Sequence, residues 1–206
     1  MNFVRLLLLL LLLFSALFSE ELIDRQIEQQ ALKKYGPFAK NRFIDLQNSL
    51  LHTLKHAPIN EQLNHVNSWV NTLHYASDKE LYGVRDYWAT LYEFVARGKG
   101  DCEDYTIAKY FILKALGVDP HRMKFAYVIY KNRRGKKIAH MVLLYFKVKH
   151  PKSRDDILIL DNNNRLVLPA SKRPDLVKMI KMINGDTGAK SKKWKELEVN
   201  MKRKKI

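Results

Sequence analysis

Hydrophobic residues in the first half of the chain recur every three to four positions, which is the spacing of one helical face. The pattern predicts helices over residues 22–32, 38–54 and 60–73. Pro37 and Pro58 fall between them, and proline interrupts a helix because it lacks a backbone N–H. These three helices are expected to form a scaffold that covers a core.

A fourth helix differs from these three because it is apolar on nearly every side. It is predicted over residues 103–116, and Gly117 follows at the position where a helix commonly ends. A helix without a polar face is expected to be buried. It begins within the turn at residues 98–104, so Cys102 is expected at the N-terminus of a buried helix.

The hydrophobic pattern changes to that of strands after residue 124, with many β-branched and aromatic residues. It predicts strands over residues 125–130 and 138–148, with a hairpin turn over residues 131–136 between them. Shorter strands are predicted over residues 156–161 and 165–168. Helices followed by antiparallel strands indicate an α+β domain, in which the buried helix packs on the sheet.

The N-terminus has the pattern of a secretory signal. Arg5 precedes an unbroken leucine run, and the apolar stretch ends at Phe18. This stretch is shorter than the roughly 20 residues that a membrane-spanning helix needs, so we predict a signal peptide over residues 1–19. The alternative that this segment is not cleaved and anchors the protein to the membrane stays open. The main domain is expected over residues 20–188, with a basic tail over residues 189–206.

The chain is strongly basic, with a formal net charge of +16. The last 17 residues, 190–206, hold eight lysines and arginines against two glutamates. Such a tail is expected to be solvated and partly disordered, or to contact an anionic membrane. Export from the cytoplasm argues against nucleic acid as a partner.

Cys102 is the only cysteine, so the chain forms no internal disulfide. A helix N-terminus favours a thiolate, and nucleophilic chemistry also needs an imidazole and a group that orients it. His140 lies within one predicted strand and Asp161 ends the next. Considered separately, His140 could be a core residue whose hydrogen bonds are made within the protein, and Asp161 could simply begin a turn. Their order along the chain favours a Cys102, His140 and Asp161 triad.

Three segments together resemble a known family: GKGDCED at residues 98–104, AHMVL at 139–143 and LDN at 160–162. They closely resemble bacterial transglutaminase-like cysteine peptidases of the LapG type. The resemblance implies a papain-like, transglutaminase-like fold, with Cys102 as nucleophile, His140 as base and Asp161 as orienting acid. It also implies a periplasmic protease that cleaves the N-terminal region of a large surface adhesin and so controls biofilm attachment.

The same resemblance implies a cofactor and a regulator. Calcium would lie beside the nucleophile, bound through Asp101 and Glu103, with Asp104 as a further ligand. Three carboxylates within four residues suit the oxygen preference of Ca²⁺. From spacing alone, Asp101 also fits a helix cap, and Asp104 fits the first helical turn. The implied regulator is an inner-membrane receptor for cyclic di-GMP that sequesters the protease.

The predicted reaction is acyl transfer through a thioester at Cys102, followed by hydrolysis. The Cys102 N–H and a donor from the segment around Trp88 are expected to hold the oxyanion. Two other functions stay open at this stage. The thioester could be captured by a lysine amine, which would make the protein a transamidase. Alternatively, the cleft could bind peptides without catalysis.

Overall fold

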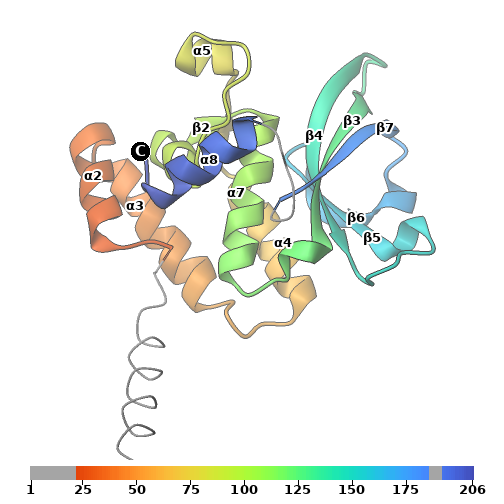
Figure 1. The fold of residues 1–206 in the computed structure, drawn as a ribbon, viewed down its shortest axis with the longest axis horizontal. Coiled ribbons are helices and arrows are strands. Elements are labelled where there is room, and N and C mark those ends of the chain that lie inside the picture. Colours follow the sequence, from red (N-terminus) through yellow and green to blue (C-terminus); the bar gives the residue numbers. More distant parts are fainter. Residues whose placement is uncertain (1–21, 186–191) are drawn as a thin grey trace, which may run out of the picture.

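The computed structural model describes residues 22–185 and 192–206, and it divides into a helical half and a sheet half that lie side by side (Figure 1). The longer helices are α2 (Arg25–Tyr35), α3 (Pro37–Asp45), the π-helix η1 (Leu46–His52), α4 (Ile59–Val70), α7 (Cys102–Ala115) and α8 (Lys192–Lys202). The shorter helices are α5 (Asp78–Tyr82), α6 (Leu91–Arg97) and the 3₁₀ turns η2 (Pro120–Arg122), η3 (Arg154–Asp156) and η4 (Ala170–Lys172). The predicted α+β class is confirmed.

The strands form one large sheet and one small one. The large sheet contains β3 (Met123–Lys131), β4 (Lys137–Phe146), β5 (Ile157–Asp161), β6 (Asn164–Pro169) and β7 (Leu176–Asn184). It is antiparallel, in the order β6-β5-β4-β3-β7. A short parallel pair joins β1 (His74–Tyr75) to β2 (Lys99–Gly100) just before α7. The predicted strands correspond to β3, β4, β5 and β6.

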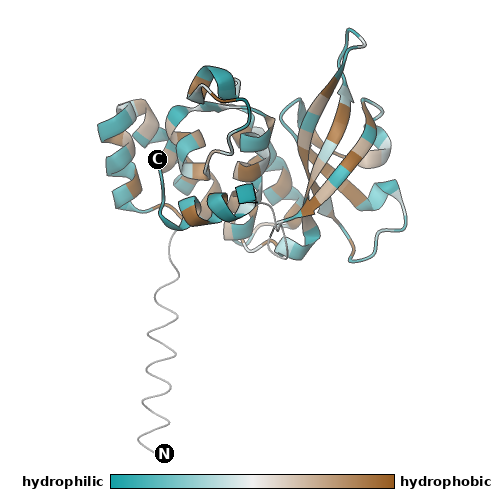
Figure 2. Ribbon diagram, turned by 45° about the horizontal axis from the view of Figure 1, so that its top comes forward, coloured by the Kyte–Doolittle hydropathy of each residue, from teal (hydrophilic) through white to brown (hydrophobic). Residues whose placement is uncertain are grey.

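The N-terminal helices form close to where the sequence pattern placed them, with α2 three residues later than predicted, and local features explain the boundaries of α2 and α3. Asp24 accepts a hydrogen bond from Ile27 N at 2.9 Å at the start of α2. Gly36 ends that helix with φ of 83°, a conformation that costs glycine little, and Pro37 opens α3. The predicted helix over residues 38–54 continues through the π-helical turn η1 instead of remaining α-helical. Hydrophilic residues cover much of α2, at the outer edge of the molecule (Figure 2).

Helix α7 is buried against β4, as its apolar sequence predicts. Its inner residues have no exposed surface, including Ile107, Ala108, Tyr110 and Ile112. The face of the sheet turned toward the helices contributes Phe125, Met141, Leu143 and Tyr145 to the same core. The opposite face holds a smaller cluster built from Ala126, Val128, Val142 and Leu144. The sheet therefore carries apolar side chains on both faces, and α7 fixes the position of Cys102 relative to β4.

Strand β7 was not predicted from the sequence. Its hydrophobic residues do not alternate cleanly with polar ones, and two irregularities interrupt its pairing with β3. It is an edge strand, and Val177, Met179, Ile180 and Met182 are each more than two-fifths exposed. An edge strand with no buried face lacks the period-two signal on which strand prediction depends.

The expectation of a solvated C-terminal tail is wrong for its helical part, because α8 packs on the core. Trp194, Leu197 and Met201 are buried, and Trp194 makes ring contacts with Trp88 and Phe125. These apolar residues recur at helical spacing within a lysine-rich segment. The high charge of the segment therefore obscured the pattern of an amphipathic helix in the sequence. The predicted signal peptide and residues 186–191 lie outside the described residues. None of the described helices is long and apolar enough to cross a membrane.

Candidate active site

Cys102 occupies the first position of α7, where local hydrogen bonds define the start of the helix. The Asp101 side chain accepts from Glu103 N at 3.3 Å, and the Asp104 carboxylate accepts from Asp101 N at 3.2 Å. Together they form a capping box, so the expected capping roles are observed. Gly100 is required for this packing, because a Cβ there would lie 2.6 Å from the Phe94 ring and closer still to Asp104.

The N-terminus of α7 is joined directly to the strand that carries His140. Thr106, one turn after Cys102, shares its hydroxyl between Cys102 O at 2.7 Å and Met141 O at 3.2 Å. The backbone N–H of Met141 also interacts with the thiol. Cys102 therefore lies beside the residue that follows His140, although the two are distant in sequence.

His140 and Asp161 form a buried pair across β4 and β5. His140 Nε2 lies 2.7 Å from Asp161 Oδ1, and the two residues are 6% and 1% exposed. Asn163 N donates to the same carboxylate oxygen at 2.9 Å. Because Nε2 is occupied by Asp161, Nδ1 is the ring nitrogen that remains to face a nucleophile. The carboxylate thereby fixes both the orientation and the tautomer of the imidazole.

The main chain of Asp161 is anchored by α4. Asp161 N donates to Asn67 Oδ1 at 3.1 Å, and Asn71 Nδ2 donates to Asp161 O at 2.9 Å. Asn67 is fully buried, which is unusual for an amide side chain without such partners. The N-terminal helices therefore do more than cover the core, because α4 fixes the position of Asp161 relative to His140.

Arg173 completes this cluster and was missed in the sequence. It is 1% exposed, and its Nη2 donates to Asp161 Oδ2 at 2.5 Å and to Asp175 Oδ2 at 2.7 Å. Burial alone would raise the pKa of Asp161, but the bonds from His140 and Arg173 hold that pKa far below its usual value. The only available sequence signal was indirect: a buried carboxylate requires a compensating cation.

An acidic cluster lies on the other side of Cys102. Carboxylate oxygens of Asp78, Asp101 and Asp104 lie within 4.8 Å of one another, as do ligand atoms of Asp101, Cys102 and Glu103. Asp78 was not predicted, since it precedes the motif at residues 98–104 by twenty residues. Of the predicted metal ligands, Asp101 and Asp104 thus group with Asp78, whereas Glu103 points to the thiol and accepts from Cys102 Sγ at 2.8 Å.

The carboxylates of this cluster form no ion pair among the described residues; Lys193 opposes the shift at Asp78 only in part, and the pKa values of all three rise. Burial, followed by repulsion from Glu103 and Asp104, raises the pKa of Asp101 to about 9. Burial and the Asp78 charge raise the pKa of Asp104 to about 8, although two backbone N–H groups oppose the shift. Asp78 Oδ1 is buried without a hydrogen-bond partner, while its other oxygen accepts from Tyr87 N at 2.6 Å. Crowded hard oxygens with an unsatisfied atom fit a divalent cation such as Ca²⁺.

The same cluster opposes the thiolate that the helix N-terminus was expected to favour. Burial, followed by the Glu103 and Asp101 charges, raises the pKa of the Cys102 thiol instead of lowering it. The helix dipole contributes only about half a unit charge, so nearby full charges outweigh it. No hydrogen bond joins Cys102 to His140 in the parts of the chain that the structure describes. The structure thus brings His140 and Asp161 into contact, and places the thiol beside Met141.

A cysteine at the tip of a buried helix, packed on an antiparallel sheet with a His–Asp pair, defines the class of papain-like, transglutaminase-like cysteine proteases. Residues 45–202 match the family described as bacterial transglutaminase-like cysteine proteinase BTLCP, and the chain belongs to this family. The comparison with curated proteins finds no match.

Solved structures of LapG from Legionella pneumophila are similar over nearly their whole length. One is 36% identical to this chain, with a TM-score of 0.68, and the match covers 87% of this chain and 96% of that one. A calcium-bound form is 32% identical, with coverage of 87% and 99% and a TM-score of 0.68. An EGTA-treated form is 33% identical, with coverage of 85% and 96% and a TM-score of 0.69. The predicted family is confirmed.

Proposed function

We propose that this protein is an exported, calcium-dependent cysteine endopeptidase that cleaves the N-terminal region of a large cell-surface adhesin. The observation that carries the proposal is the buried His140–Asp161 pair beside the N-terminus of the helix that begins at Cys102. Membership of the cysteine proteinase family supports the reaction type. The adhesin substrate and the role in biofilm release are proposed from the resemblance of residues 98–104, 139–143 and 160–162 to peptidases of the LapG type, and the likeness to Legionella LapG agrees with that resemblance.

In the proposed reaction, the Cys102 sulfur attacks the scissile carbonyl carbon after its proton passes to His140. The tetrahedral intermediate collapses, the C–N bond breaks, and His140 gives the proton to the leaving amine. Water then attacks the thioester, aided by His140, and frees the acid product and the thiol. Asp161 orients the ring and stabilises the imidazolium, since it faces Nε2 at 2.7 Å.

The oxyanion requires donors near the thiol. The Cys102 N–H is one of the first helical N–H groups, which have no partner within the helix. A second donor is proposed from the segment around Trp88, which reaches the first turn of α7 where Ala89 N donates to Asp104 Oδ1 at 2.9 Å. Trp88 Nε1 is buried and has no partner among the described residues, so it is a donor in this segment that remains free.

Asp78, Asp101 and Asp104 are the residues that would hold calcium, with Glu103 as a further ligand. A bound Ca²⁺ supplies positive charge beside the thiol, which offsets the carboxylates that now raise its pKa. Glu103 would then turn from the thiol toward the cation, and the sulfur would be released to interact with His140. The calcium-bound and EGTA-treated forms of Legionella LapG support calcium as the cation, and the choice of ligands is proposed from the grouped carboxylates.

The proposal extends to location and regulation. A signal peptide over residues 1–19 would deliver the enzyme to the periplasm, where calcium and the adhesin are accessible. An inner-membrane receptor for cyclic di-GMP would sequester it and so control cleavage. The lysines of the C-terminal segment would contact an anionic membrane, since α8 buries only its apolar face.

The direct test mixes the purified protein with the N-terminal region of a large adhesin from the same organism, with calcium or with EGTA. We expect a defined fragment on a gel with calcium and none with EGTA. Cys102→Ala and His140→Ala are expected to lose cleavage, because each removes an atom that reacts. His65→Ala, which changes an exposed histidine of α4, is the matched control and should cleave normally.

Retained cleavage by Cys102→Ala would refute the nucleophile. A cross-linked product with an added amine donor, in place of hydrolysis, would instead indicate a transamidase. Reaction with iodoacetamide offers a further check, because Cys102 is the only thiol in the chain. Labelling that depends on calcium supports an activated thiolate, whereas labelling that calcium leaves unchanged argues against the role given to the cation.

A further inference from the structure

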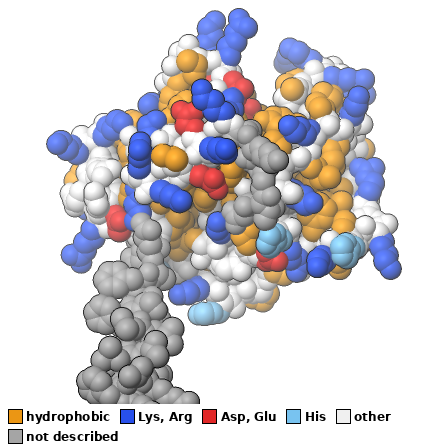
Figure 3. All heavy atoms as spheres, in the orientation of Figure 1, with side chains coloured by type: hydrophobic (Ala, Val, Ile, Leu, Met, Phe, Trp, Pro, Cys, Tyr) orange, Lys and Arg blue, Asp and Glu red, His pale blue; other side chains and the backbone are white. Residues whose placement is uncertain are grey.

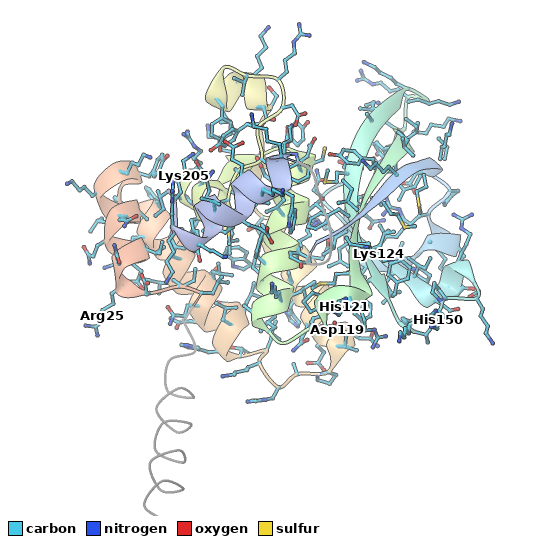
Figure 4. All side chains as sticks on the ribbon, viewed as in Figure 1. Arg25, Asp119, His121, Lys124, His150 and Lys205 are labelled. Atoms are coloured by element: carbon cyan, nitrogen blue, oxygen red, sulfur yellow. The ribbon has the colours of Figure 1, made fainter. Side chains whose placement is uncertain are left out.

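A hollow lies at the end of the sheet remote from the β3–β4 hairpin. It has a volume of about 920 Å³. It is built from η2, the start of β3, the segment that follows β4, and the end of β7. Its lining residues are Asp119, His121, Arg122, Lys124, Phe146, Lys147, Val148, Lys149, His150, Pro151 and Met182. Figure 4 labels Asp119, His121, Lys124 and His150 around it, and we call it the basic groove.

The basic groove carries an excess of positive charge. Arg122, Lys124, Lys147 and Lys149 line it against a single lining carboxylate, Asp119, and Asp156 outside the lining interacts with Lys147 only at longer range. None of these four cations forms an ion pair within the described residues 22–185 and 192–206. Figure 3 shows Lys, Arg and His side chains around exposed hydrophobic atoms over this part of the sheet. Opposing charge is therefore expected from a partner.

The central cation is held in place by the protein. Arg122 Nε donates to Phe146 O at 2.7 Å, its Nη2 donates to Lys147 O, and its guanidinium stacks over the Tyr145 ring. Lys124 Nζ lies 5.2 Å from the centre of the Phe146 ring. Positions fixed in advance reduce the entropy that binding costs. The groove is thus preorganised at Arg122 and Lys124.

The shape and lining distinguish between kinds of anion. The volume far exceeds that of a phosphate ion, and Phe146, Val148 and Met182 add apolar surface that a bare anion does not use. A concave surface also suits a bilayer poorly, since an element that binds at the membrane interface inserts its apolar face into the bilayer, and the apolar residues here lie at the floor of a hollow. An extended peptide with acidic and apolar side chains matches both the cations and the apolar floor.

We propose that the basic groove is an exosite that binds an acidic segment of the protein substrate. This inference rests on the proposed proteolytic function for the identity of its ligand. His140 and Phe146 lie six residues apart on β4, which places the groove about 20 Å from the catalytic imidazole. An acidic segment at least about six residues from the scissile bond would reach it in an extended conformation.

The binding test uses a fluorescein-labelled peptide of about ten alternating glutamates and alanines, long enough to span roughly 33 Å. Fluorescence anisotropy is measured with the full-length wild-type protein and with a Lys124→Gln/Lys149→Gln variant. The matched control is Lys33→Gln/Lys55→Gln, which removes the same charge from exposed positions in the helical half. We expect the groove variant to weaken binding about tenfold and the control less than twofold.

Four results would overturn the exosite. Equal weakening in both double variants would indicate attraction by net charge alone. Equal binding of a peptide with glutamine in place of glutamate would exclude charge recognition. Displacement by millimolar inorganic phosphate would indicate a phosphate site. Stronger binding of the groove to phosphatidylglycerol vesicles than to the peptide would indicate a membrane surface.

Cleavage kinetics then test the link to the substrate. For a substrate with an acidic segment, the groove variant should raise KM several-fold and leave kcat unchanged, because the groove is remote from the reacting atoms. An unchanged KM would overturn the substrate role. If the wild type cleaves nothing, the proposed function fails, while the anisotropy experiment still decides whether the groove binds acidic peptides.

Discussion

Two charged clusters flank Cys102, and they differ in whether their buried carboxylates are paired with cations. On the sheet side, the Asp161 carboxylate is balanced by His140 and Arg173. On the helix side, Asp78, Asp101 and Asp104 crowd together, and none of them forms an ion pair within the described residues 22–185 and 192–206. Consequently the pKa of Asp161 is held low, while the pKa of Asp101 is raised to about 9 and that of Asp104 to about 8.

This difference indicates that one part of the site does not depend on calcium, whereas the other does. Arg173 belongs to the chain and always neutralises Asp161, so the geometry of the His140–Asp161 pair should be the same with and without calcium. The helix-side cluster leaves its positive charge to come from outside, which suits control by calcium. In this protein the part of the site that calcium would control consists of like charges, whereas the part that stays fixed consists of paired opposite charges.

The largest expected effect comes from breaking the balanced cluster. Arg173→Met leaves the Asp161 carboxylate buried with one partner fewer, which should lower the free energy of unfolding by about 3 kcal/mol. Urea denaturation at pH 7 measures this loss. The stability that ionised Asp161 contributes is present above its unfolded pKa of about 3.9 and is lost as pH falls below it. The gap between variant and wild type should therefore shrink below about pH 4.

The matched variants for this prediction are Arg173→Lys and Asp175→Asn. Arg173→Lys keeps the charge but loses the forked geometry, so it should recover part of the stability. Asp175→Asn removes the partially exposed partner and should cost less than Arg173→Met. A gap that stays constant from pH 7 to pH 3 would contradict the charge balance and indicate lost packing alone.

An intermediate effect is expected at the acidic cluster. Asp78→Asn removes one charge from the proposed calcium ligands and should weaken calcium binding about tenfold. Isothermal titration calorimetry of the metal-free protein measures the change. Asp86→Asn is the control, because its carboxylate lies in the segment that follows α5 but is 59% exposed and faces Lys193. Equal affinities for Asp78→Asn and wild type would remove Asp78 from the site.

The smallest effect is a pH dependence that should appear only without calcium. The folded pKa of Asp101 lies above its unfolded value, so its contribution to stability falls as pH rises from about 4 to about 9. In EGTA, Asp101→Asn should match wild type near pH 4 and become more stable by about 1 kcal/mol near pH 9. Thermal melting at several pH values measures the difference, and added calcium should reverse its sign.

Much of the fold could be predicted from local patterns. The helices α2 and α4 follow a helical period because one of their faces packs on the core, whereas α7 is apolar all round because it is buried. The strands β3 to β6 were recognised from their β-branched and apolar runs between turns. β7 and α8 could not be predicted for opposite reasons. β7 has no buried face to impose a period, while the lysines of α8 hid three apolar residues that pack on Trp88 and Phe125.

The amino-acid sequence by itself determined the position of Cys102 at a helix tip and placed His140 and Asp161 on neighbouring strands. These features depend on caps, glycines and periods that act over a few residues. Only the tertiary structure decided that Arg173 balances Asp161 and that Asp78 joins the acidic cluster. The physical reason is that compensation of a buried charge depends on distance in space, and such a partner can come from any part of the chain.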